Sequence, residues 1–446
     1  MEKRLLEGWG KERIRERCIK VMLLASLVII SGGEAATRDA SSCSQSDVQA
    51  AINSSSDGDT LLIPAGNCTW FSSVSTGGKA ITIQGDGRSS TIITVSASGE
   101  GLNVTNNAGK AITIKSMKWM GQATVNGLIK ISGTIKSFRI TDCNFDWTGY
   151  GSPPDGAIVI SGYAHGVIDH CTFAPANNST YRSGIRVEPD GTANAYARDS
   201  ALGTANSVYV EDCIFIEPTP IGYSHAIWAQ NGGSYVFRHN SVTNWGIDMH
   251  GHCTSGGGRE FEIYNNTFAA TGSYSGATIT IRGGTGVIYN NTFTSNGYRM
   301  YGQGLRMQEV DDGDICNAMT GGACHACTYP ALYQLGRGKN NSLDPIYMWN
   351  NNLDGSYWVS NPSNPPYLKS PYQINTVWAS DSADSACDSA CGGAQQAPHY
   401  FTQLNRDYYD SESTAKPGYT SYTYPHPLVT GDAPPAAPQN LRLIPD

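Results

Sequence analysis

The sequence predicts an all-β chain that coils into a solenoid of stacked, parallel β-strands. One phrase occurs twice, as residues 260–268 and 285–293, and the second Asn of each copy, Asn266 and Asn291, lies 25 residues from its twin. Within each phrase, β-branched and aromatic residues alternate with polar ones, which is typical of short strands. A repeat of this length cannot bury its apolar face alone, so it must stack on its neighbours.

Further segments align on the same Asn position. The aligned residues are Cys143, Cys171, Cys213, Asn240, Asn266, Asn291 and Asn351, at steps of 28, 42, 27, 26, 25 and 60 residues. In a parallel stack these side chains lie about 4.8 Å apart, so the asparagines can hydrogen-bond in a ladder. The cysteines can stack as buried thiols or pair with a neighbour. The two long steps indicate loop insertions, over residues 189–205 and 310–341, that leave the same edge of the coil.

This repeat and its ladder resemble the right-handed parallel β-helix of the pectin-lyase-like superfamily, over roughly residues 44–353. The phrase Gly-Asp-Thr followed by Ile-Pro-Ala-Gly, within residues 58–66, is similar to the opening coil of many exported β-helix proteins. The resemblance implies a fold much more strongly than it implies an activity.

The two ends of the predicted solenoid, residues 37–353, need cover. Ser44 and Asp47 form a cap-like pair before Val48, Ala51 and Ile52, so we expect a short helix that caps the N-terminal end. Residues 354–430 lack the repeat, and we expect this irregular tail to pack on the solenoid and cover its edge. Residues 431–446 are expected to be a Pro/Ala-rich linker or the start of a lost module.

The first 36 residues are expected to be a signal peptide. A basic segment precedes a short apolar segment, residues 21–30, and small residues follow. That apolar segment is too short to span a bilayer, so we expect a mature chain without a membrane span. We expect it to be secreted or extracellular, with the periplasm or cell surface as alternatives. Cys43 and Cys68 flank the first coil and are the expected disulfide.

The charge of the chain restricts its partners. The formal net charge is −8, and residues 1–36 carry seven Lys/Arg and five Glu, so the mature chain has −8 − 2 = −10. An acidic surface argues against a nucleic-acid partner. An anionic ligand must then be held by a local cluster of cations.

The strand before each ladder phrase places polar side chains on the outside of the coil. Its inward positions are apolar and end with the pairs Ile279/Ile281 and Leu305/Met307. One outward column reads Lys130, Val159, Arg186, Trp228, Asp248, Thr280 and Arg306; the other reads Ser132, Ser161, Glu188, Gln230, His250, Arg282 and Gln308. Reactive groups gather in the lower half, which both insertions border, and this favours a binding cleft. The alternative is a solvated face with ion pairs such as Arg186–Glu188 or Asp248–Arg282.

The cluster suits β-elimination from a uronate-containing polysaccharide. Arg282 would neutralise the sugar carboxylate, and His250 or His252, on the same strand face, would remove the acidified proton. The stretch 277–291 is similar to the arginine-bearing strand of the alginate and chondroitin lyases of this superfamily, which place a lysine base where this chain has His250-Gly-His252. Substrate binding would fall to Arg186, Glu188, Trp228, Gln230, Asp248 and Arg306.

Three alternatives stay open. A glycoside hydrolase would use Glu188 and Asp248, which we expect roughly 10 Å apart. The same two carboxylates could hold a calcium ion, as in pectate lyases, and no other metal set is evident. A non-catalytic adhesin, stalk or glycan-binding protein is equally compatible with β-helix repeats. In each case we expect a monomer whose partner is a polysaccharide, and for the lyase we expect an anionic one.

Overall fold

The architecture comes from a computed structural model. It describes residues 35–105, 111–122, 124, 126–135, 137–148, 156–175, 182–189, 197–218, 224–250, 257–272, 277–294, 296, 301–305, 335–353, 356–357, 405–411 and 413–431, some by backbone alone. The chain divides into two compact units, Met1–Ala36 and Thr37–Asp446. The description below concerns the second unit. Among the described residues, no helix combines the length and apolarity needed to cross a membrane.

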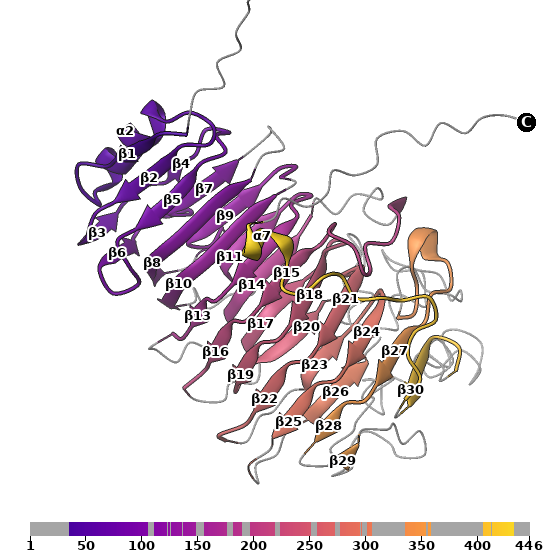
Figure 1. Cartoon of the computed structure of the whole chain (residues 1–446). Helices are drawn as coiled ribbons and strands as arrows, with labels where there is room; N and C mark the ends of the chain where they lie inside the picture. Colours follow the sequence, from indigo (N-terminus) through magenta and orange to yellow (C-terminus); the bar gives the residue numbers. More distant parts are fainter. Residues whose placement is uncertain are drawn as a thin grey trace, which may run out of the picture. The chain divides into compact units, whose positions relative to one another are not determined.

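The second unit is a parallel β-solenoid, as predicted (Figure 1). Each complete coil contributes one strand to each of three walls. The first wall contains β1 (Thr37–Asp39), β2 (Thr60–Ile63), β5 (Thr82–Gly85), β8 (Ile112–Gln122), β10 (Phe138–Thr148), β12 (Gly166–Asp169), β15 (Val208–Glu211), β18 (Ser234–Arg238), β21 (Glu260–Tyr264), β24 (Thr285–Tyr289), β27 (Ile346–Trp349) and β30 (Tyr408–Ser411).

The second wall follows the first after a turn that is two residues long in most coils. It contains β3 (Gly66–Trp70), β6 (Thr91–Val95), the second halves of β8 and β10, β13 (Thr172–Phe173), β16 (Ile214–Ile216), β19 (Ser241–Thr243), β22 (Thr267–Ala269), β25 (Thr292–Thr294) and β28 (Asn352–Leu353), with β29 (Ser356–Tyr357) antiparallel to β28. The third wall is a separate sheet of β4 (Val74–Ser75), β7 (Leu102–Thr105), β9 (Ile129–Ser132), β11 (Gly156–Ser161), β14 (Arg182–Glu188), β17 (Ser224–Ala229), β20 (Gly246–Met249), β23 (Ala277–Ile281) and β26 (Tyr301–Leu305).

The predicted ladder lies at the turn between the first and second walls. Asn240 Nδ2 donates to Asn266 Oδ1 (3.1 Å), Asn266 to Asn291 (3.0 Å) and Asn291 to Asn351 (3.0 Å). In the preceding coils the same position holds Cys143, Cys171 and Cys213, which are buried free thiols. The prediction of stacked thiols is therefore confirmed, and the alternative of a disulfide between neighbouring coils is wrong. The residue before each ladder position has a positive φ, and these residues are Asp142, His170, Asp212, His239, Asn265, Asn290 and Asn350. His170 and His239 therefore occupy turn positions.

The core lies between the three walls. Aromatic side chains of the second wall stack from coil to coil inside it, with ring centroids 4.7 Å apart for Phe145 and Phe173 and 4.6 Å for Phe173 and Phe215. This spacing matches the spacing of parallel strands, so each coil continues the packing of the previous one.

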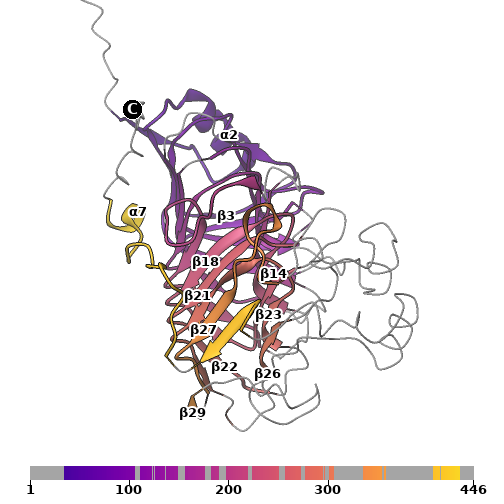
Figure 2. The ribbon, with the colours of Figure 1, turned by 90° about the vertical axis from the view of Figure 1, so that its right-hand side faces the viewer.

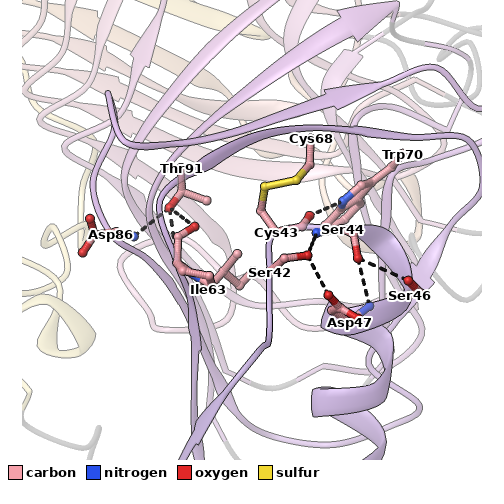
Figure 3. Close-up of a disulfide and its surroundings, with 11 residues drawn as sticks. Ser42, Cys43, Ser44, Ser46, Asp47, Ile63, Cys68, Trp70, Asp86 and Thr91 are labelled. Atoms are coloured by element: carbon pink, nitrogen blue, oxygen red, sulfur yellow. Dashed lines mark hydrogen bonds between the residues drawn. A yellow bond between two sulfur atoms is a disulfide. The ribbon is translucent and has the colours of Figure 1, made fainter.

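The N-terminal end carries helix α2 (Gln45–Ser54), as the capping sequence predicts. Ser44 is the N-cap and accepts from the Asp47 amide (3.3 Å), and Val48, Ala51 and Ile52 are buried. The Cys43–Cys68 disulfide forms beside it, with Cα atoms 5.7 Å apart, and ties the segment before α2 to β3 (Figure 3). Trp70 Nε1 donates to the Cys43 carbonyl (3.0 Å), which anchors the same corner.

The described residues of the C-terminal tail, from 405 onward, pack on the solenoid. Strand β30 pairs in parallel with β27, beyond the predicted end of the repeat at residue 353. Residues 413–431, the C-terminal strap, then run back along the outside of the first wall to the short helix α7 (Pro427–Thr430) near β12 (Figures 1 and 2). The strap covers an outward apolar cluster of Val167, Tyr209, Val236, Tyr264, Val287 and Tyr289.

The strap is also held by buried charges of the first wall. Arg238 pairs with Glu211 (2.6 Å), and both side chains are fully buried. Arg238 donates to the carbonyls of Tyr422 and Thr423 (2.8 Å each), and the Glu211 carboxylate accepts from the His426 amide (2.8 Å). Burial raises the pKa of Glu211, although Arg238 opposes this shift.

Candidate functional site

The predicted columns of outward side chains lie on the third wall, with the expected register through six coils. Strand pairing aligns Lys130 with Val159, Val159 with Arg186, Arg186 with Trp228, Trp228 with Asp248 and Asp248 with Thr280. The neighbouring apolar residues, from Ile129 to Ile281, belong to the core. The side chains named for the site therefore point away from the core on one wall.

The last coil departs from the prediction. Thr280 pairs with Gly304 and Ile281 with Leu305, so the register is two residues away from the predicted one. The position predicted for Arg306 belongs to Gly304, and this part of the alignment was wrong because no ladder residue fixes the coil before the long insertion. Arg306 and His252 themselves lie outside the described residues.

Arg186 and Glu188 form the upper half of the cluster. Arg186 Nε donates to Glu188 (2.8 Å), and a second bond between the same side chains makes the pair bidentate. Gln230 Nε2, one coil below, donates to the same carboxylate (2.9 Å). The Arg186 guanidinium lies 5.5 Å from the ring centre of Trp228, within reach of a cation–π contact.

Asp248 organises the lower half. Its Oδ2 atom lies 3.1 Å from His250 Nδ1 and 3.1 Å from the guanidinium of Arg282, on the next coil. The His250 ring packs on Trp228, with centroids 4.9 Å apart, and this contact joins the two halves. Arg186, Trp228, His250 and Arg282 therefore lie side by side, as the sequence predicts.

The charges fix the proton on His250. Burial opposes ionisation of Asp248, but Arg282 and the hydrogen bond from His250 outweigh it and hold the pKa of this carboxyl well below its usual value. An ionised carboxylate can only accept hydrogen bonds, so His250 Nδ1 carries the proton and donates. When this imidazole is neutral, its lone pair is therefore on Nε2, the nitrogen that can act as a base.

His225 belongs to this cluster, and the sequence pattern missed it. Strict alternation places it inward with Ile227, but a β-bulge between His225 and Ile227 shifts the register against β20. Ala226 and Ile227 are both in the core, so His225 is turned to the outer side, where it interacts electrostatically with Asp248. Burial lowers the pKa of His225 to about 4, so its imidazole is neutral at pH 7. Bulges commonly re-aim side chains beside active sites.

The cluster is outward-facing but largely covered. Arg186 and Arg282 are each 8% exposed, Trp228 is 5% exposed and Asp248 is buried, whereas the His250 side chain keeps 24% of its surface. Both ion pairs that the sequence offered as the alternative to a binding cleft are present. The formal charges of Arg186, Glu188, Asp248 and Arg282 sum to zero, and each carboxylate both orients its arginine and balances the arginine's charge.

Described segments of the two insertions meet each other, and the first of them also contacts the first wall, where the amides of Ala201 and Gly203 donate to Glu260 and Glu262. Both insertions follow third-wall strands, β14 and β26, as predicted from the two long steps. Lys339, in the 3-10 helix η1 (Lys339–Asn341), forms an ion pair with Asp199 (2.7 Å), which joins the described parts of the two insertions.

The metal and hydrolase alternatives depend on Glu188 and Asp248. Within the described ranges, no group of three or more His, Cys, Asp or Glu side chains could hold a metal ion. Each of the two carboxylates accepts from protein donors, so a calcium ion held there would have to replace some of them. A hydrolase needs a protonated carboxyl as its general acid, and Asp248 is held ionised.

Comparison of the sequence with protein-family models and with curated proteins finds no match. Among solved structures, the chain is similar to an alginate lyase from Paenibacillus sp. str. FPU-7, with a TM-score of 0.37 and 12% identity over 72% of this chain and 96% of that chain. It is also similar to ORF18 of Geobacillus virus E2, with a TM-score of 0.34 and 13% identity over 66% and 60% of the two chains. Neither likeness carries an argument about activity, so function has to be argued from the third wall.

Proposed function

We propose that the third wall carries the active site of an exported polysaccharide lyase that cleaves a uronate-containing glycan by β-elimination. The observation that supports this most is the position of Asp248, whose Oδ2 atom holds both a candidate base, His250, and a candidate carboxylate-binding group, Arg282. β-Elimination requires these two functions within a few ångströms of each other. The disulfide Cys43–Cys68 fits an oxidising compartment outside the cytoplasm.

In the proposed reaction, Arg282 binds the uronate carboxylate and stabilises the negative charge that develops as the proton on the adjacent carbon leaves. His250 Nε2 takes that proton. The electron pair of the broken C–H bond forms a carbon–carbon double bond, and the glycosidic oxygen leaves with the electrons of its bond to carbon and takes up a proton from water. Trp228 supports the His250 ring, and Arg186 with Gln230 would contact neighbouring sugars.

The test is incubation of the mature chain with alginate, pectate and chondroitin, followed by ultraviolet absorbance of the unsaturated product. Absorbance should rise with one of these glycans and be lost in Arg282→Ala and His250→Ala. Lys130→Ala is the matched control, because it removes a cation from the same wall four coils from His250 and should retain activity. New reducing ends without absorbance would favour a hydrolase.

A second candidate is a non-catalytic glycan-binding protein. It is favoured by the ion pairing of both arginines, Arg186 with Glu188 and Arg282 with Asp248, which a buried structural network would also require. In this case a polysaccharide would bind without any change in absorbance or in reducing ends. Variants of His250 would then leave affinity unchanged, whereas Arg282→Ala would weaken it.

A further inference from the structure

A groove on the second wall, near the N-terminal end, lies apart from the third-wall cluster. It encloses about 490 Å³. Its lining comes from β3, β6, β8 and β10 and the residues that follow them: Thr69, Thr94, Val95, Ser96, Ala97, Met120, Gly121, Gln122, Asp146, Trp147 and Thr148. The residues of the candidate lyase site are on other strands, so the groove would act independently of that site.

Strand register arranges the polar groups of the groove in two columns. Pairing aligns Thr69 with Thr94, Thr94 with Met120, and Met120 with Asp146. Two residues further along each strand, Gln122 aligns with Thr148. Ser96 continues this column, because its backbone N–H donates a hydrogen bond to the Trp70 carbonyl (2.8 Å). Neighbours within a column are about 4.8 Å apart, and the columns are separated by about 7 Å. Hydroxyl and amide groups therefore recur at regular intervals on one surface.

Gly121 lies between the two columns. Its φ is +124°, and a Cβ atom would come within 2.1 Å of the Val95 carbonyl oxygen. Gly121 aligns with Val95 and Trp147, whose side chains lie in the core, so the strip between the two columns consists of backbone. A ligand can approach the backbone closely there.

An exposed aromatic residue, Phe71, lies two residues after Thr69 of the lining and is not itself a lining residue. Phe71 follows Trp70, so it occupies the position next to Ser96 in the second column. It is 72% exposed, the highest value among the exposed large hydrophobic side chains of the described residues. Aromatic rings at the edge of a polar groove suit ligands with both apolar and hydroxyl-bearing faces.

The charge of the groove selects against an anionic ligand. Asp146 is the only ionisable residue in the lining and pairs with Lys118 (3.1 Å), so the surface offers no net positive charge. The remaining polar groups are neutral donors and acceptors. This composition differs from that of the third wall, where two arginines lie beside the candidate base.

We propose that this groove binds a neutral polysaccharide chain, with Phe71 stacked on one sugar ring and the hydroxyl and amide columns bonded to the next two or three. The four coils span about 15 Å between their first and last strands, which matches the length of about three sugar units. The groove would hold the protein on a neutral glycan while the third wall acts on another chain.

The test is isothermal titration of the full chain with neutral hexasaccharides of glucose, mannose and xylose type. One of these should bind, and Phe71→Ala should weaken binding about tenfold. Thr94→Trp fills the groove and should abolish binding. Ile214→Ala is the matched control, since Ile214 is an exposed apolar residue of the second wall outside the groove. This variant should bind the glycan as the wild type does.

Several results would overturn the proposal: no hexasaccharide binds, Phe71→Ala and Ile214→Ala weaken binding equally, or only charged glycans bind. Phe71→Ala alters an exposed side chain and should fold, so a folding failure of Thr94→Trp leaves the test intact. Asp248→Asn, which disables the third-wall site, should not change groove binding. If the protein gives no absorbance change with any uronate glycan but binds a neutral glycan through Phe71, only the proposed lyase function is refuted.

Discussion

Asparagine in place of Asp248 tests the central contact of the third-wall cluster. The substitution keeps the shape of the side chain and removes its charge. Oδ2 of Asp248 lies 3.1 Å from both His250 Nδ1 and the Arg282 guanidinium, and the carboxyl is buried. The amide can still accept one hydrogen bond, but it cannot balance the charge of Arg282, which is only 8% exposed.

The expected effect on stability follows from this burial. Removing one partner of a buried ion pair costs about 3–5 kcal/mol, because a charge stays desolvated without its counter-charge. The retained amide hydrogen bond offsets part of this loss, so we expect the free energy of unfolding to fall by about 3 kcal/mol. The usual pKa of an Asp carboxyl is 3.8, and the pKa of Asp248 in the folded chain is lower. The Asp248 carboxylate therefore contributes this stability in full at pH values above 3.8, and the contribution is lost as the pH falls below that value.

The expected effect on turnover follows from the tautomer. An Asn amide can either accept from or donate to Nδ1 of His250, so it no longer fixes the proton on Nδ1. The lone pair is then not fixed on Nε2, the nitrogen that acts as the base. A positioned general base contributes about 100-fold to 10,000-fold, and we expect kcat on the cleaved glycan to fall by at least about 100-fold. Urea unfolding followed by circular dichroism gives the first quantity, and the absorbance assay gives the second.

Asp199→Asn is the matched control. It removes a carboxylate from an exposed ion pair with Lys339 and should change neither unfolding nor turnover. Wild-type stability in Asp248→Asn would refute the assignment of a buried ion pair. A large loss of stability with unchanged kcat per folded molecule would refute the role of His250 and leave Asp248 as a structural residue.

Three further predictions concern the scaffold. Asn266→Ala removes buried hydrogen bonds to Asn291 and to the Phe237 carbonyl. It should lower the free energy of unfolding, measured by urea titration, by about 3 kcal/mol. Asn266→Cys should lose less stability, since Cys occupies this ladder position in three other coils. Cys43→Ser opens a 25-residue loop and should cost about 3 kcal/mol, and the wild type should lose the same amount on reduction. Burial lowers the pKa of His426 from 6.5 to about 4, so the wild type should lose up to about 3 kcal/mol as the pH falls from 6.5 to 4. His426→Asn should remove that part of the pH dependence, and an unchanged slope in the same urea titrations would contradict the assignment.

The ladder made the fold predictable from the sequence. A buried Asn has to satisfy its amide group, and it does so with the equivalent Asn of the next coil and a backbone carbonyl of the previous coil, as Asn266 does with Asn291 and Phe237. That requirement fixes the register of the first wall, and the third wall follows because the coils without an insertion have nearly the same length. The columns from Lys130 to Thr280 could therefore be read directly from the alignment.

The same reasoning fails where a coil departs from the repeat. The coil that contains Leu305 is followed by the long insertion, so no ladder residue lies close enough to set its register. The bulge between His225 and Ile227 adds a residue that strict alternation cannot anticipate. The path of the strap was also beyond prediction, because residues 413–431 have no periodicity to indicate which wall they cover.

Buried charge alone does not mark a functional site in this chain, as the first and third walls together demonstrate. Arg238 of the first wall uses all five of its N–H groups on Glu211, Tyr264 and the carbonyls of the strap. The chain itself completes that network, which identifies it as the fastening of the strap. Asp248 differs, because its Oδ1 atom is buried and accepts no hydrogen bond within the described structure. A buried, ionised oxygen without a donor is costly, so a network that retains one beside a candidate base has a reason other than stability.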